Sequence, residues 1–106
     1  MTHKYQWSPQ ARTEMQLALR ESKHRWGVEQ RDAYRRRVSD VVKSISQNPE
    51  MGMVRPRWGQ GMRSFIVGAH VLVYSVEDSV VIILRVLHQH EDLERALGLR
   101  REDAFD

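Results

Sequence analysis

The sequence predicts an α+β domain in which an antiparallel helical hairpin packs on a small, mainly antiparallel sheet of three to four strands. Residues 9–47 carry apolar side chains at helical spacing. Residues 62–88 are rich in Val, Ile, Leu, Phe and Tyr, which favour strands. A short strand before the helices and a short helix after the sheet complete the prediction. We expect a single domain over residues 1–99 and a polar tail over residues 100–106.

The first helix is predicted over Pro9–Trp26. Ser8 suits the N-cap, and proline suits the first helical position, where its missing N–H costs nothing. Apolar residues then recur at the three-four spacing of one helical face, and Gly27 is a natural C-cap. Before this helix, Tyr5–Trp7 is a candidate for a short edge strand.

A second helix is predicted over Val28–Gln47. Its apolar residues form one stripe, which consists of Tyr34, Val38, Val41, Val42 and Ile45. Asn48-Pro49 ends the helix because proline disfavours helical geometry in the residue before it. Since Gly27 is the only connector, the two helices should form an antiparallel hairpin whose apolar surface packs on the sheet.

Residues Met62–His88 are predicted to form three consecutive strands, with turns at Gly68-Ala69 and at Glu77–Ser79. The last strand, Val80–Leu87, is apolar on both faces apart from Arg85, which is typical of a central strand covered above and below. Elsewhere we expect a loop over Glu50–Gly61 and a short helix over His90–Leu97.

Composition and charge limit the classes of function. The chain has no cysteine, which excludes disulfides and thiolate chemistry, and no apolar run approaches a membrane span. The first nine residues lack the apolar core of a signal peptide, so a cytoplasmic location is expected. Residues 1–50 have a net charge of +4, residues 51–76 have three arginines and no acid, and residues 77–106 have a net charge of −4. This asymmetry favours an anionic partner for the basic part, although solvated helix faces explain it equally well.

Three features are candidates for chemistry or binding. His88 and His90 end the last strand, but no third ligand follows at a suitable spacing, so neither a metal nor another cofactor is expected. Arg85 either pairs with an acid under a covered face or offers a cation on an open surface. Three arginines surround Trp58, at positions 55, 57 and 63, and could bind RNA, bind an acidic protein segment or cover the core edge. The sequence contains no phosphate-binding loop or nucleophile elbow.

Several motifs, in this order, resemble the ParE toxins of the RelE/ParE superfamily. They are Ser8–Ala11, Arg25–Gln30, Asn48-Pro49 with Gly52, Gly61–Phe65, Val67-Gly68, His70-Val71 with Tyr74, Ile83–His88 and Asp92–Leu97. The resemblance covers residues 4–97 and implies a RelE/ParE-like fold. It also implies a toxin of a type II toxin–antitoxin system that a cognate ParD-like antitoxin neutralises.

Two activities occur in this superfamily. ParE-like members inhibit DNA gyrase by binding, whereas RelE-like members cleave mRNA on the ribosome, typically with a tyrosine near the C-terminus. This chain has no tyrosine beyond Tyr74 and is acidic over residues 91–94. We therefore expect a non-enzymatic gyrase inhibitor that does not bind nucleic acid directly, with the mRNA endonuclease as the alternative.

The resemblance and the charge pattern together suggest two sets of residues, and no catalytic residue is assigned. The candidates for target binding are Arg63, Arg85, His88 and His90. The candidates for antitoxin binding are Arg31, Arg35, Arg57 and Trp58.

Overall fold

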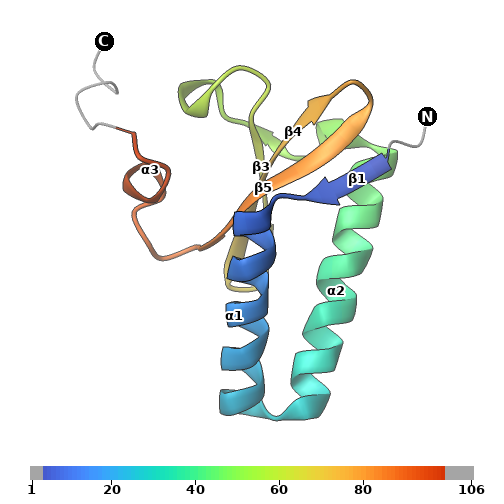
Figure 1. Ribbon diagram of the computed structural model, residues 1–106, viewed down its shortest axis with the longest axis vertical. Coiled ribbons are helices and arrows are strands. Elements are labelled where there is room, and N and C mark those ends of the chain that lie inside the picture. The colour runs from blue at the N-terminus through green and yellow to red at the C-terminus, as the bar shows by residue number, and fades with distance from the viewer. Residues whose placement is uncertain (1–3, 100–106) are drawn as a thin grey trace.

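The structure is a computed structural model that describes residues 4–99 (Figure 1). Its elements are β1 (Lys4–Trp7), α1 (Pro9–Trp26), α2 (Val28–Gln47), the 3₁₀ turn η1 (Pro49–Met51), β2 (Met53–Val54), the 3₁₀ turn η2 (Pro56–Trp58), β3 (Arg63–Val67), β4 (His70–Glu77), β5 (Val80–His88) and α3 (Leu93–Ala96). The predicted α+β class is confirmed, and both long helices begin and end at the predicted residues. The predicted tail, residues 100–106, lies outside the described residues.

The described strands form one sheet in the order β1-β5-β4-β3-β2. β1 pairs with β5 in parallel, and the other neighbours are antiparallel. With five strands the sheet exceeds the predicted three to four, because β2 lies within the segment predicted to be a loop. A two-residue segment is too short to show the alternation of apolar and polar side chains that predicts a strand. It is a strand because it pairs with the start of β3. The turn between β4 and β5 places Asp78 and Ser79 at φ 50° and 64°, as a two-residue type I′ turn requires.

The hairpin covers one face of the sheet, and its closed end extends beyond the strands (Figure 1). The main core lies between these layers and contains Ala11, Met15, Ala18, Val38, Val42, Ile45, Val67, Leu72, Tyr74, Val81, Ile83 and Val86. On the opposite face, Val71, Val73 and Leu87 are covered by side chains of α3 and of the segment around η2. The predicted two-sided cover is therefore present, and it extends to β4 as well as β5. No helix within residues 4–99 is long and apolar enough to cross a membrane.

A bulge in β5 breaks the strict alternation of its side chains. Val73 of β4 pairs with Arg85, whereas the next residue, Tyr74, pairs with Ile83, so Leu84 has no partner on β4. One extra residue shifts the side chains that follow to the other face. As a result Ile83 and Val86 both contribute to the core under the hairpin.

The hydroxyl of Tyr74 fixes the segment that leads into β2. The side chain is fully buried, donates a hydrogen bond to Pro49 O at 2.7 Å and accepts one from Gly52 N–H at 2.9 Å. Burial raises the pKa of this phenol. A Cβ at Gly52 would meet the Tyr74 hydroxyl and would lie 2.9 Å from Ser64 O, so only glycine fits there. The last tyrosine of the chain is therefore a structural residue.

Candidate interaction surfaces

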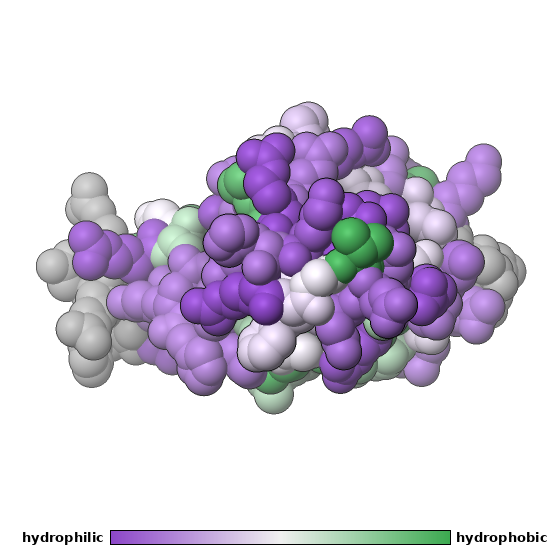
Figure 2. All heavy atoms as spheres, turned by 90° about the horizontal axis from the view of Figure 1, so that it is seen from below, coloured by the Kyte–Doolittle hydropathy of each residue, from purple (hydrophilic) through white to green (hydrophobic). Residues whose placement is uncertain are grey.

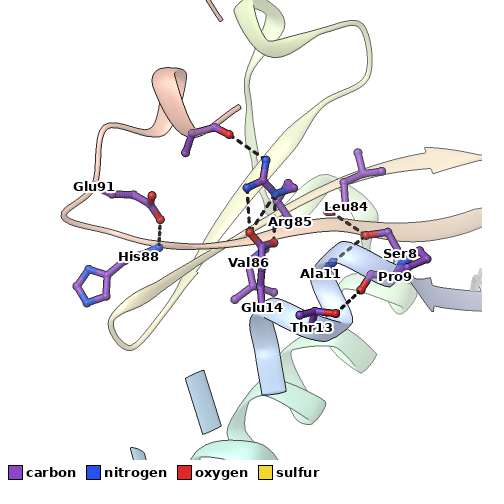
Figure 3. A network of polar contacts seen from close by, with 11 residues as sticks. Ser8, Pro9, Ala11, Thr13, Glu14, Leu84, Arg85, Val86, His88 and Glu91 are labelled. Atoms are coloured by element: carbon purple, nitrogen blue, oxygen red, sulfur yellow. Dashed lines mark hydrogen bonds and ion pairs between the residues drawn. The ribbon is translucent and has the colours of Figure 1, made fainter. Parts of the chain in front are cut away.

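The outer edge of β5 is closed by side chains of the same chain (Figure 3). β1 pairs with β5 only up to Ile83, where the chain turns into α1, so the rest of β5 would otherwise be an open edge. Three hydrogen bonds satisfy that edge: Ser8 Oγ donates to Leu84 O at 2.8 Å, Val86 N–H donates to Glu14 at 2.9 Å, and His88 N–H donates to Glu91 at 2.7 Å. We call residues 84–88 with these partners the capped edge.

Arg85 lies within the capped edge and is fully engaged. Its Nε and Nη2 donate to the Glu14 carboxylate at 2.9–3.2 Å, and its Nη1 donates to Ala96 O at 3.0 Å. The Arg85 and Glu14 side chains are each 20% exposed. Of the two predicted alternatives, the structure has the one in which Arg85 pairs with an acid. The pair joins α1, β5 and α3 (Figure 3).

Glu14 is the residue of this surface that sequence reasoning missed. It lies three residues after Ala11 and four before Ala18, both buried in the core, so its spacing places it on the apolar face of α1. An acid on an apolar helix face is the signal that could have identified it. The sequence does not indicate which cation, 71 residues away, would pair with it.

His88 and His90 lie together at the end of β5, beside His70 of β4. The ring centroids of His70 and His88 are 5.6 Å apart, and those of His88 and His90 are 5.4 Å apart. No group of three potential metal ligands occurs within residues 4–99. The three imidazoles thus form a row of aromatic contacts across the ends of two neighbouring strands.

Hydrogen bonds define the tautomers of this row. Tyr34 Oη donates its only proton to Val67 O at 2.7 Å, so Nδ1–H of His70, 2.7 Å from the same oxygen, is the donor to Tyr34. Burial lowers the pKa of His70, the neighbouring His88 lowers it further, and Glu21 and Glu91 oppose these effects. His88 Nδ1 accepts from His90 N–H at 3.3 Å, which leaves the proton of neutral His88 on Nε2.

A recess of about 230 Å³ opens beside His70 and His88, between the closed end of the hairpin and the turn from β3 to β4. Its walls include Trp26, Tyr34, His70, His88, Glu21 and Arg25. Figure 2, which looks onto this end of the molecule, shows a mainly hydrophilic surface with small, separate hydrophobic spots.

A groove of about 150 Å³ runs between β1, α1 and α2. Its walls are largely apolar and include Trp7, Met15, Leu19 and Val42, with Arg35 also lining it. Arg31, one turn earlier on α2, pairs with Asp32 at 3.0 Å. Of the two antitoxin-binding candidates on α2, Arg35 is therefore the one that lines an apolar groove.

The opposite side of the sheet has exposed apolar side chains at its edge. β2 pairs only with Arg63 and Ser64 of β3, and within the described residues no strand pairs with the outer side of residues 65–67. Met53, Val54 and Ile66 are 62%, 56% and 59% exposed. We call β2 and residues 65–67 the open edge.

Arginines beside the open edge are held by local contacts. The Arg55 guanidinium lies 4.5 Å from the ring centroid of Trp58, and its Nε donates to Ser64 Oγ at 2.9 Å. Arg63 Nη1 donates to Gly52 O at 2.9 Å and to Glu50 O at 3.2 Å. The structure therefore places one arginine of the predicted group, Arg55, on the indole of Trp58.

The structure separates the two predicted sets of residues. Among the target-binding candidates, His88 and His90 are neighbours, Arg85 is paired in the capped edge, and Arg63 lies on β3 across β4. The antitoxin-binding candidates divide between the hairpin, with Arg31 and Arg35, and η2, with Arg57 and Trp58. Trp58 packs on the sheet face opposite the hairpin, so one ligand would have to pass around an edge to reach both groups. The roles of these residues stay predictions.

Comparison with known proteins decides the family. Residues 5–93 match the model for the ParE toxin of the type II toxin–antitoxin system parDE. The chain belongs to the ParE toxin family. It is 31% identical over 98 residues to toxin ParE1 of Mycobacterium tuberculosis, covering 92% of this chain and 100% of that protein in strains CDC 1551 / Oshkosh and H37Rv.

Solved structures support the fold of this ParE family member. The chromosomal ParDE system of P. aeruginosa contains a chain with a TM-score of 0.70 and 18% identity, covering 82% of this chain and 96% of that one. The toxin–antitoxin complex RelBE2 of Mycobacterium tuberculosis gives a TM-score of 0.56 and 22% identity, covering 84% and 100%. These likenesses confirm the predicted RelE/ParE-like fold, and the family match makes the protein a toxin of a type II toxin–antitoxin system, as the sequence predicted.

Proposed function

We propose that this ParE toxin arrests growth in the cytoplasm by binding DNA gyrase, without bond-breaking chemistry of its own, and that a ParD-like antitoxin neutralises it. The observation that carries the proposal is the pairing of Arg85 with Glu14. Cleavage of a phosphodiester needs cations aimed at the phosphate. Here the guanidinium of Arg85 is bound to a carboxylate, and Arg63 donates to two main-chain carbonyls. The burial of Tyr74 also removes the last tyrosine as a candidate acid or base.

The rival function is a ribosome-dependent mRNA endonuclease. The row of His70, His88 and His90 favours it, because imidazoles serve as general acids and bases near neutral pH. Two assays on the purified protein separate the functions. We expect inhibition of gyrase supercoiling, or accumulation of cleaved gyrase–DNA complexes, and no new 5′ ends in primer extension on translated messages. New mRNA ends with unaffected gyrase would establish the rival.

For neutralisation, we propose that an acidic antitoxin segment lies in the groove between β1, α1 and α2 and continues to the open edge. The groove offers apolar surface beside the cation of Arg35, and residues 51–76 contain no acid to repel such a segment. A segment that folds on binding can cover a long path of this kind.

The test is co-purification of the toxin with the product of the neighbouring antitoxin-like gene. Arg35→Glu should weaken the complex at least about tenfold, because a like charge would then face the acidic segment. Arg20→Glu, an exposed arginine of α1 that does not line the groove, is the matched control and should leave affinity nearly unchanged. Equal affinity of the two variants would exclude the groove.

A further inference from the structure

The proposed function assigns no ligand to the recess at the closed end of the hairpin, although His88, a predicted target-binding residue, lines it. The recess has the features of a docking site. Trp26 lines it and is 69% exposed, the most exposed large hydrophobic side chain within residues 4–99. A tryptophan in this position loses contact with water only when a partner covers it. Exposed aromatic residues beside a pocket are frequent anchors of protein interfaces.

Two hydrogen-bonding atoms in the recess remain available. His70 gives its Nδ1 proton to Tyr34, so Nε2 of the neutral ring carries a lone pair, and that atom has no partner among the described residues. No unpartnered side-chain nitrogen or oxygen of residues 4–99 is fully enclosed, so this Nε2 remains accessible. Neutral His88 carries its proton on Nε2 and offers a donor, since its Nδ1 accepts from His90. An acceptor and a donor therefore lie on rings whose centroids are 5.6 Å apart.

The two charged side chains that line the recess have opposite signs. Glu21 and Arg25, one turn apart on α1, pair at 3.6 Å. Burial lowers the pKa of His70 and thereby favours its neutral form, and Tyr34 has its proton engaged with Val67 O. A recess with no net charge and with aromatic walls favours an uncharged aromatic group over an ion. The available donor and acceptor additionally require a polar atom that can both give and receive a hydrogen bond.

A phenol is uncharged and aromatic, and its hydroxyl can both donate and accept a hydrogen bond. We propose that the recess is a docking point for a tyrosine side chain of a protein partner. The tyrosine ring packs against Trp26, and its hydroxyl donates to His70 Nε2 and accepts from His88 Nε2–H. The proposal names the chemistry of the partner and does not depend on whether that partner is gyrase.

The test uses p-cresol, the side-chain analogue of tyrosine, and follows the Trp26 indole N–H and the His70 and His88 ring signals by NMR. We expect these signals to shift together, with a millimolar dissociation constant, as a ligand of this size allows. Toluene, which has the same ring without the hydroxyl, should bind about fivefold more weakly because the two imidazole nitrogens then lose their partner. Absence of shifts at these three residues, or equal binding of toluene, would overturn the proposal.

Three variants locate the site. His70→Asn keeps a donor at the position of Nδ1 for Tyr34 and removes the Nε2 acceptor, so p-cresol should bind about fivefold more weakly. Trp26→Ala removes the exposed ring, with a similar loss expected. Leu17→Ala, an equally simple truncation of a 55% exposed residue of α1 outside the recess, is the control and should bind p-cresol as the natural chain does. Unchanged binding in both recess variants would place p-cresol elsewhere and refute the proposal.

Protonation provides an independent check. Acid adds a proton to His70 Nε2, which then no longer accepts, so p-cresol binding should fall as the pH drops through the lowered pKa of His70. The groups that face this ring are Glu21 and Arg25 on α1, Tyr34 on α2, His88 on β5 and Glu91. His70→Asn should remove this pH dependence, and its persistence in the variant would contradict the role of His70. Since these assays contain neither gyrase nor antitoxin, their failure would leave the proposed function unaffected.

Discussion

The capped edge and the open edge differ in whether side chains of the same chain cover them. Along the capped edge, outward-pointing main-chain groups of β5 are bound by Ser8, Glu14 and Glu91. Along the open edge, β2 is two residues long, and Met53, Val54 and Ile66 are more than half exposed. An unprotected edge strand invites pairing with another chain, and inward-facing charges prevent it. The difference indicates that this toxin excludes strand-like partners from β5 and leaves β2 and β3 accessible.

The largest effect on stability is expected from a substitution just before β2, at the open edge. Gly52→Ala should lower the free energy of unfolding by about 3 kcal/mol, because the added Cβ meets the buried Tyr74 hydroxyl and the Ser64 main chain. Urea denaturation measures the loss. Gly61→Ala is the control, since a Cβ at Gly61 would meet no neighbour and only its positive φ of 76°, in contrast to −78° at Gly52, should lower the free energy of unfolding, by about 1 kcal/mol. Similar losses in both variants would mean that the contact of a Cβ with Tyr74 and Ser64 destabilises the protein no more than a strained glycine turn does, and would contradict the reason given for Gly52.

The second prediction removes the cap of the other edge. Glu14→Ala should lower the free energy of unfolding by about 2 kcal/mol. The substitution leaves the Arg85 charge and the Val86 N–H without their partner at a site that is only one-fifth exposed. Glu21→Ala breaks the exposed pair with Arg25 and should cost less than about 0.5 kcal/mol. Denaturation of both variants gives the comparison. If the two losses were equal, the capped edge would contribute no more than a surface ion pair.

A more gradual effect is expected from acid at the end of the capped edge, where His88 adjoins His70. The pKa of His70 is lowered in the folded protein relative to 6.5, so the unfolded chain binds the proton first. The free energy of unfolding should therefore decline as the pH falls from about 6.5 through the lowered pKa of His70, and this contribution is absent at higher pH. Thermal denaturation across this range detects it. His70→Asn should remove that part of the slope, whereas His24→Asn, at an exposed position of α1, should leave it in place.

The smallest effect on stability is expected for a charge placed on the open edge. Ile66→Lys should change the free energy of unfolding by less than about 0.5 kcal/mol, because the side chain is 59% exposed. If the antitoxin follows the open edge as proposed, the same change should reduce its affinity at least about tenfold, since a lysine blocks strand addition. Isothermal titration of the antitoxin into the natural toxin and into the Ile66→Lys variant measures this affinity. Val76→Lys on β4 is the control, and equal weakening by both variants would argue against a specific role of this edge.

Local patterns were sufficient for most of the fold. Ser8-Pro9, Gly27 and Asn48-Pro49 set the ends of both long helices correctly, because capping and proline geometry act within a few residues. The run of β-branched residues over 62–88 likewise predicted β3, β4 and β5. β2 was missed because a two-residue strand exists only through its partner, β3.

The site residues were harder to predict, for the same physical reason. The sequence identified Arg85 as a residue that needs an acid or an open face, and it grouped arginines with Trp58. It did not identify Glu14 as the acid, nor the contacts of Tyr34 with His70 and of Tyr74 with Gly52. Each of these pairs is more than 20 residues apart in the chain and depends on the packing of separate elements.

The sequence by itself therefore determined the two long helices with their ends, the strands β3, β4 and β5, and the ParE family, all of which follow from interactions between near neighbours or from the order of short motifs. Tertiary structure alone decided which edge of the sheet is capped, that Arg85 is paired and that Trp26 borders a recess. The capped edge and the Arg85 pair depend on the bulge at Leu84 and on the packing of α1 against β5. The physical reason is that hydrogen bonds and ion pairs form only over a few ångströms. Residues so far apart in the sequence come that close only when the chain has folded.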